Sequence, residues 1–405
     1  MTAPAAAAGD PDPPRAGFRN VVVMSVAMFA LVAGEQLGTR FLPRYLVFLG
    51  APAVAVGLWG SGKDFLDAAL QYPGGALSDR FGSQRALMLF TAIAGLGYVV
   101  YALAPDWPWL FLGLALAAAW GSLASPGMFA LVAESLPSGR RALGFTVQSI
   151  LRRVPILFAP ALGGLLVERR GLPGGLRAAF GIAAGLALLT LLFQRRFYVR
   201  AAGGVPPVFL PLVELWRRAP SALRRLLVAD VLARAAESAA DVFVVLVVLD
   251  RFAVPPSRYG AWVGLQMAVS IASYFPGAWL ATRFGRVLPV TITFVMFAAF
   301  PLAVALARDA GGLPLAFVLA GLRELGEPAR KALIVDASPP GARGQTVGAY
   351  YLARSLLILP AGVLGGLAWA RDPRAPFLIA AAFGAVGVVW FLATFRDPVP
   401  DAATG

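Results

Sequence analysis

Long apolar segments, separated by short polar ones, run along almost the whole chain of 405 residues. A helix needs about 20 predominantly apolar residues to cross the hydrocarbon core of a bilayer. Twelve segments reach or approach this length, so the pattern predicts an all-α membrane protein with twelve transmembrane helices. The predicted helices cover approximately residues 19–42, 53–73, 86–103, 108–133, 143–166, 177–194, 222–249, 259–281, 288–307, 312–335, 344–369 and 375–395.

The composition agrees with this prediction and restricts the possible chemistry. Hydrophobic residues make up 59% of the chain and charged residues only 14%, whereas a typical soluble domain carries about 25% charged residues. Histidine and cysteine are both absent. This excludes disulfides, thiolate nucleophiles, a Ser-His-Asp triad and metal sites that need imidazole or thiolate ligands. A membrane-embedded hydrolase would then need an aspartyl or Ser/Lys site, but no G-x-G-D-type pattern is present and the charges are spread over six helices. We expect a protein that is not an enzyme and carries no cofactor.

Arginine is distributed unevenly between the two alternating sets of loops. The richer set includes both ends of the chain and contains the pairs Arg140-Arg141 and Arg195-Arg196. Because basic loops remain on the cytoplasmic side, we expect both termini there, in a protein of the inner membrane. Topology and contact with anionic lipid of the bilayer then account for the excess of 35 basic over 21 acidic residues. No nucleic-acid partner is predicted.

The two halves of the chain match each other at an offset of about 202 positions. This repeat predicts two six-helix bundles, 18–197 and 221–396, joined by a basic cytoplasmic linker, 198–220. Residues 1–17 are rich in Ala and Pro, lack a signal-peptide pattern and are expected to form a disordered cytoplasmic tail. A second cytoplasmic tail is expected at 397–405. The matching pairs include Pro126 with Pro328, Glu134 with Asp336, Arg152 with Arg354, and Gly163 with Gly365.

The loop between the second and third predicted helices carries a motif. Residues 75–87 read Gly-Ala-Leu-Ser-Asp-Arg-Phe-Gly-Ser-Gln-Arg-Ala-Leu. This is similar to the pattern G-x-L-a-D-r-x-G-r-k-x-x-l of the major facilitator superfamily, although Ser83 and Gln84 replace its basic pair. The resemblance covers nearly the whole chain, through the twelve helices and the two halves, and implies the fold of that superfamily. It also implies a latch that closes the cytoplasmic side, formed by Gly75, Asp79, Arg80 and Gly82.

A shorter segment of the fifth predicted helix resembles a narrower group. Residues 160–164 read Pro-Ala-Leu-Gly-Gly, like the end of the signature G-x-x-x-G-P-x-x-G-G of drug/proton antiporters. Pro155 and Ala159 stand where that signature has its leading glycines, and the arginine of the fourth helix in those antiporters is missing here. The segment implies a drug-antiporter-like branch of the family. Its small residues are also what close helix packing requires.

Charged residues occur in only some of the predicted helices. The third, ninth and twelfth helices contain none, and the sixth contains only Arg177, at its first position. The family resemblance implies that these four helices face lipid. A charge at mid-membrane costs about 2.5–3.5 kcal/mol and therefore faces protein or water. We expect the charges on the remaining helices to face a central cavity. The candidates for substrate or proton binding are Glu35, Lys63, Asp64, Asp67, Arg152, Asp230, Arg234, Glu237, Asp241, Arg323, Glu327 and Arg354.

The spacing of these charges predicts particular contacts. The four candidates of the seventh helix follow one another at intervals of four, three and four residues, which places them on one helical face. Lys63 lies next to Asp64 and one turn from Asp67, so we expect it to pair with one of them. The repeat-related Arg152 and Arg354 are expected to face each other across the cavity. All of these charges could instead form ion pairs that only hold helices together.

Arg323 and Glu327 lie one turn apart in the predicted tenth helix. Arg330 and Lys331 follow near its cytoplasmic end, where long basic side chains can snorkel to the interface.

The predicted function is secondary active transport of a small organic solute by alternating access. No G-x-x-x-x-G-K-[ST] motif is present, so the energy must come from a solute or ion gradient. Paired intramembrane carboxylates favour proton-coupled export of an amphipathic or cationic molecule by a monomer. A uniporter or proton symporter of an anionic or zwitterionic metabolite is the alternative within transport. A membrane sensor of transporter fold that does not transport is the alternative of a different class.

Overall fold

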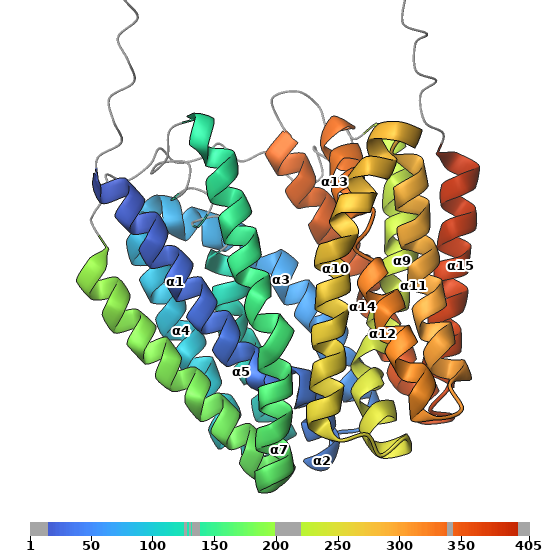
Figure 1. Cartoon of the computed structure of the whole chain (residues 1–405), viewed down its shortest axis with the longest axis horizontal. Helices are drawn as coiled ribbons and strands as arrows, with labels where there is room; N and C mark the ends of the chain where they lie inside the picture. Colours follow the sequence, from blue (N-terminus) through green and yellow to red (C-terminus); the bar gives the residue numbers. More distant parts are fainter. Residues whose placement is uncertain are drawn as a thin grey trace, which may run out of the picture.

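The computed structural model describes residues 15–124, 128, 131, 138–198, 220–337 and 343–395. Figure 1 shows two helical bundles side by side, with the start of α1 and the end of α15 at the same end of the molecule. The first bundle contains α1 (Arg15–Gly38), η1 (Thr39–Phe41), α2 (Leu42–Phe48), α3 (Ala53–Phe81), α4 (Ser83–Leu103), α5 (Trp107–Ala118), η2 (Ala119–Leu123) and α7 (Ser138–Phe197).

The second bundle repeats this arrangement within the described residues. It contains α9 (Ser221–Leu246), η3 (Val247–Arg251), α10 (Pro256–Phe284), α11 (Val287–Leu306), η4 (Ala310–Gly312), α12 (Leu313–Leu322), α13 (Glu327–Asp336), α14 (Arg343–Trp369) and α15 (Ala375–Thr394).

These helices confirm the predicted all-α architecture of twelve spans in two halves. Two of the predicted spans lie within α7, which reverses at Gly171, where φ is 71°. This left-handed backbone is strained for residues other than glycine. Six of the described helical stretches are long and apolar enough to cross a membrane by length and composition. Leu189 of α7 and Val389 of α15 are 63% and 68% exposed, as expected for helices that face lipid.

Glycines bring the two bundles into close contact at symmetry-related places. A Cβ atom on Gly164 of α7 would lie 2.4 Å from the carbonyl oxygen of Pro256, the first residue of α10. Gly366 of α14 is its counterpart in the repeat, and a Cβ atom there would lie 2.5 Å from the carbonyl oxygen of Ala53 of α3. The antiporter-like segment therefore packs helices against each other, and it does so as part of the internal repeat.

The predicted tenth span is not one continuous helix. It breaks between α12, which ends at Leu322, and α13, which begins at Glu327. The amide of Gly326 donates to Thr293 Oγ1 of α11 at 2.7 Å instead of continuing the helix. Pro328 has no amide hydrogen and starts the new helix in its second position. Arg323 therefore lies in a turn, and the expected helical spacing of Arg323 and Glu327 is wrong.

The loop that carries the predicted latch is a tight turn. Gly82 separates α3 from α4 with a φ of 81°, and Gly285 separates α10 from α11 with a φ of 83°. Arg80 is exposed at the end of α3. Gly75 and Asp79 lie within α3, and the side chain of Asp79 is outside the part of the chain that the structure describes.

Candidate functional site

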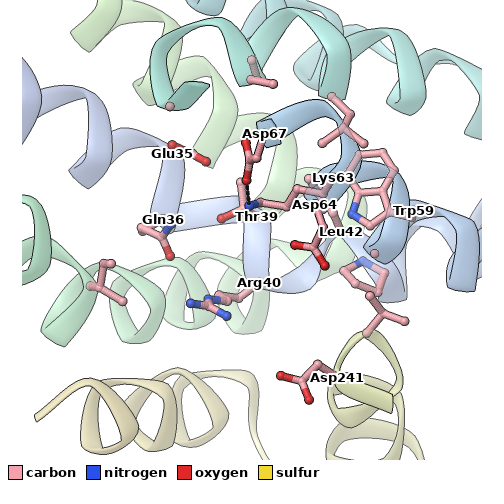
Figure 2. A pocket seen from close by; sticks show the side chains of 18 of the residues that line it. Glu35, Gln36, Thr39, Arg40, Leu42, Trp59, Lys63, Asp64, Asp67 and Asp241 are labelled. Atoms are coloured by element: carbon pink, nitrogen blue, oxygen red, sulfur yellow. Dashed lines mark hydrogen bonds and ion pairs between the residues drawn. The ribbon is translucent and has the colours of Figure 1, made fainter. Parts of the chain in front are cut away.

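Seven of the predicted site residues lie around one cavity between the two bundles, which we call the first cavity (Figure 2). Its volume is about 340 Å³, within the range of small-molecule sites. Trp59, Trp120, Tyr101 and Tyr259 contribute aromatic surface to its wall, and Arg40 adds a charge. The predicted residues that line it are Glu35, Lys63, Asp64, Asp67, Arg152, Glu237 and Asp241.

Lys63 and Asp67 form an ion pair one helical turn apart on α3. Lys63 Nζ donates to Asp67 Oδ2 at 2.9 Å, and Ser122 Oγ of η2 donates to Asp67 Oδ1 at 2.5 Å. Both oxygens of Asp67 therefore have a donor. Ser122 was not among the predicted residues, because its role depends on the π-helical turn η2 that directs its side chain towards α3.

Four charged residues of the first cavity have no such partner. Glu35 and Asp64 form no hydrogen bond or ion pair with any described residue, and the same holds for Arg40 and Arg152. In Figure 2, Glu35 lies on the side of Asp67, whereas Arg40 lies nearer to Asp241. The cavity thus offers two free carboxylates and two free guanidinium groups at separate places.

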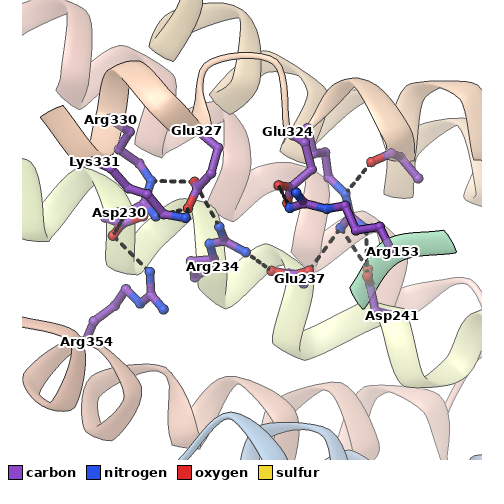
Figure 3. A network of polar contacts seen from close by, with 12 residues as sticks. Arg153, Asp230, Arg234, Glu237, Asp241, Glu324, Glu327, Arg330, Lys331 and Arg354 are labelled. Carbon is purple, nitrogen blue, oxygen red and sulfur yellow. Dashed lines mark hydrogen bonds and ion pairs between the residues drawn. The ribbon is translucent and has the colours of Figure 1, made fainter. Parts of the chain in front are cut away.

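The second bundle contains a chain of ion pairs that follows one face of α9 (Figure 3). Asp230 accepts from Arg330 at 2.5 Å, and Arg234 donates to Glu237 at 2.7 Å and to Glu327 at 3.4 Å. As their spacing predicts, the charges of this helix lie on a common face. In contrast to the snorkelling expectation, Arg330 is only 1% exposed, because Asp230 and Glu327 both bind it inside the bundle.

Arg323 continues this chain to the first cavity. Its guanidinium binds Asp241 at 2.9 and 3.2 Å and lies 3.8 Å from Glu237. The break between α12 and α13 gives Arg323 this direction, away from the helical path that would have paired it with Glu327.

A second cavity of about 520 Å³ lies between α3 and the helices α9, α13 and α14. Asp64 and Asp67 line both cavities, so the two adjoin at this stretch of α3. The lining of the second cavity from the other bundle includes Arg234, Glu327, Arg330, Lys331 and Arg354.

The expectation that Arg152 and Arg354 face each other across one cavity is wrong. Arg152 lines the first cavity, whereas Arg354 lines the second and donates to Asp230 at 3.3 Å. The repeat explains the difference, because the position that matches Asp230 in the first half is Met28. Arg354 therefore has an acidic partner on α9 that Arg152 lacks on α1.

Contacts between the bundles include polar groups that sequence reasoning missed. Arg153 of α7 donates to the hydroxyl of Tyr274 of α10, which in turn donates to Glu324 Oε2 at 2.9 Å. At the end of the molecule away from the termini, Arg44 of α2 binds Asp250 of η3 at 2.7 Å. These partners lie far apart in the sequence and are not in register in the repeat, so no local pattern indicates them.

The comparison with protein families decides the classification. The model of the Major Facilitator Superfamily matches residues 16–236 and again 226–405. The chain belongs to the major facilitator superfamily. Solved structures agree on the fold: a POT family transporter in complex with a thioalcohol-conjugated peptide superimposes with a TM-score of 0.77 at 16% identity, over 94% of this chain and 97% of the other. The nucleoside transporter NupG gives 0.77 at 13% identity, over 94% and 100%.

Curated relatives of this major facilitator protein include proteins named for resistance to drugs. Multidrug resistance protein MdtH of Sodalis glossinidius (strain morsitans) is 26% identical over 396 residues, which are 92% of this chain and 91% of the relative. Multidrug resistance protein MdtG of Escherichia coli O81 (strain ED1a) is 32% identical over 47% of this chain and 46% of its own length. Quinolone resistance protein NorA of Staphylococcus aureus is 22% identical over 43% of this chain and 45% of its own length.

Proposed function

We propose that this secondary transporter exports amphipathic small organic molecules that carry a positive charge, in exchange for protons. The observation that carries the proposal is the pair of free carboxylates, Glu35 and Asp64, in the aromatic-lined first cavity. A carboxylate without a fixed cationic partner can take either a proton or the cation of the cargo. Since the two exclude each other, proton entry would release the cargo, and this is the coupling that exchange requires.

The relatives support export rather than uptake. MdtH, MdtG and NorA are named for resistance to drugs, and aromatic surface beside carboxylates suits flat or bulky organic cations. The protein would act as a monomer in the inner membrane, with both termini in the cytoplasm.

The transport cycle would use rocking of the two bundles about the cavities. In the structure, α7 of the first bundle packs closely against α10 of the second, and α3 packs closely against α14. When the cavities face outward, a latch would hold the cytoplasmic end closed. The latch would consist of Gly75, Asp79, Arg80 and Gly82. Glycine at position 82 supports this role, because its positive φ allows the abrupt turn between α3 and α4.

Flux measurements in proteoliposomes test this function. A fluorescent organic cation should be transported faster when a proton gradient is imposed, and Glu35→Gln and Asp64→Asn should each remove that acceleration. Arg308→Gln in the loop before η4, an exposed charge outside both cavities, is the matched control and should keep it. Flux that is indifferent both to the gradient and to the two acidic substitutions would refute proton coupling. Binding without flux would indicate a sensor instead.

The second candidate is uniport or proton symport of an anionic or zwitterionic metabolite. The free guanidinium groups of Arg40 and Arg152 in the first cavity favour it. The Arg152→Gln variant separates the two candidates. If it loses transport of an organic anion but retains transport of organic cations, the result supports this candidate over the first.

A further inference from the structure

Cations outnumber carboxylates on the wall that the second bundle contributes to the second cavity. Arg234, Arg330, Lys331 and Arg354 line this wall together with one carboxylate, that of Glu327. Asp230 lies buried behind Arg330 and Arg354 and supplies a second negative charge. Glu237 supplies a third and binds Arg234 at 2.7 Å, which leaves the other three cations with two carboxylates.

Glu327 and Asp230 are shared very unequally among Arg330, Lys331 and Arg354. Arg330 binds Glu327 at 2.7 and 2.8 Å and Asp230 at 2.5 Å, so it takes the short hydrogen bonds to both. Lys331 lies 3.6 Å from Glu327 and is 59% exposed, and Arg354 reaches Asp230 only at 3.3 Å. The buried Nε of Arg354 has no hydrogen-bond partner among the described residues. Arg354 and Lys331 therefore have donor capacity that the protein does not use.

The opposite wall of the second cavity carries a free negative charge. Asp64 of α3 lines the cavity without a partner among the described residues, whereas its neighbour Asp67 is already bound by Lys63 and Ser122. A carboxylate on one bundle and spare cations on the other form a dipolar site between the two halves of the molecule.

We propose that the second cavity is an anion subsite that binds the carboxylate of an amphoteric cargo, with Arg354 and Lys331 as its contacts. The planar guanidinium of Arg354 can donate two parallel hydrogen bonds to a carboxylate, and Lys331 adds a point charge. Asp64 binds the positively charged group of the same molecule. This inference rests on the proposed function, because the cationic and aromatic part of the cargo then occupies the first cavity. The bound molecule connects α3 of one bundle with α14 of the other.

The phosphate of an anionic lipid has the same chemistry as the carboxylate of a cargo molecule and could reach the same cations. The experiment must therefore be done in the presence and in the absence of anionic lipid.

A matched pair of dyes tests the proposal on the full-length protein in nanodiscs of phosphatidylcholine. The probes are a rhodamine with a free carboxylate and the methyl ester of the same rhodamine, and fluorescence anisotropy measures their affinities. The wild type should bind the free acid more tightly than the ester. Arg354→Gln should weaken binding of the free acid by about tenfold, the effect of losing a charge-assisted hydrogen bond, and change that of the ester by less than about twofold. Lys331→Gln should give a smaller loss of the same kind.

Two variants separate a direct contact from a structural effect. Arg354→Lys should recover part of the preference for the free acid, because it restores the charge but not the planar fork. Arg308→Gln removes an exposed charge elsewhere and should change neither affinity.

Several results would overturn the anion subsite. They are a wild type without preference for the free acid, an equal loss for both dyes in Arg354→Gln, and an effect that appears only when anionic lipid is added. The last result would assign the cations to a lipid headgroup. Failure of the proposed function gives a different result from failure of the anion subsite. Flux of the ester would then not respond to a proton gradient, while the wild type would still bind the free acid more tightly.

Discussion

Asp230 is the most enclosed carboxylate of the ion-pair chain in the second bundle. Its Oδ2 accepts from Arg330 at 2.5 Å, Tyr350 at 3.1 Å and Arg354 at 3.3 Å, and its side chain is 1% exposed. Helical spacing was sufficient to predict the face on which Asp230 lies. Its partners could not be predicted, because Arg330 and Arg354 reach it from two other helices.

Removing the charge of Asp230 should destabilise the protein strongly. Asp230→Asn leaves Arg330 and Arg354 beside a neutral amide in a buried site. Breaking a buried ion pair costs about 3–5 kcal/mol. Glu35→Gln, which removes a carboxylate without a partner, should cost much less. Thermal unfolding of both variants in detergent measures the difference. Equal melting temperatures would show that the chain of ion pairs does not stabilise the fold.

The break between α12 and α13 is the element-scale feature that sequence periodicity predicted incorrectly. Apolar residues flank the charged stretch 323–331 on both sides, so the sequence pattern predicts one span from 312 to 335. The break depends on the close approach of Gly326 to α11, where a Cβ would lie 2.2 Å from the carbonyl oxygen of Pro289. Such a contact between helices leaves no trace in a hydropathy profile, although the sequence Gly326-Glu327-Pro328 contains the residues that permit it.

An alanine at position 326 tests the role of this contact. Gly326→Ala must push α11 away or move the turn that holds Arg323, and overpacking of this kind costs about 1–3 kcal/mol. The matched control is Gly185→Ala on α7, where a Cβ would meet nothing within 4 Å. Thermal unfolding should therefore separate the two variants, with Gly185→Ala at or above the wild type. Equal stability of the two alanine variants would contradict the packing argument.

At the scale of the whole molecule, the internal repeat predicted the bundles but only some of the charges, such as Arg152 and Arg354. The positions that match Lys63, Asp64 and Asp67 in the second half are Leu265, Gln266 and Val269. Backbone contacts such as those of Gly164 and Gly366 follow the repeat, because both halves must pack in the same way. Ion pairs depart from it, since a binding site between two halves needs different chemistry on its two sides.

Locking the contact between α2 and η3 should stop transport. Arg44 and Asp250 come from different bundles, and their exposed ion pair contributes little stability by itself. Arg44→Cys combined with Asp250→Cys places the only two thiols in the protein, because the chain contains no cysteine. A short thiol-reactive cross-linker should abolish flux in the double variant, and each single variant should remain active after the same treatment. Undiminished flux after complete cross-linking would show that the bundles do not separate there.

The position of Asp64 on both cavities has a consequence for selectivity. Each cavity is large enough for a small organic group, at about 340 and 520 Å³, but the two share this one free carboxylate. A cation in the first cavity can also use Glu35, whereas a cation in the second cavity has Asp64 as the one free carboxylate among the described lining residues. A single elongated molecule with one amine near its middle would satisfy Asp64 and fill both spaces. The protein would then select its cargo by length and by the position of the charge, more than by bulk.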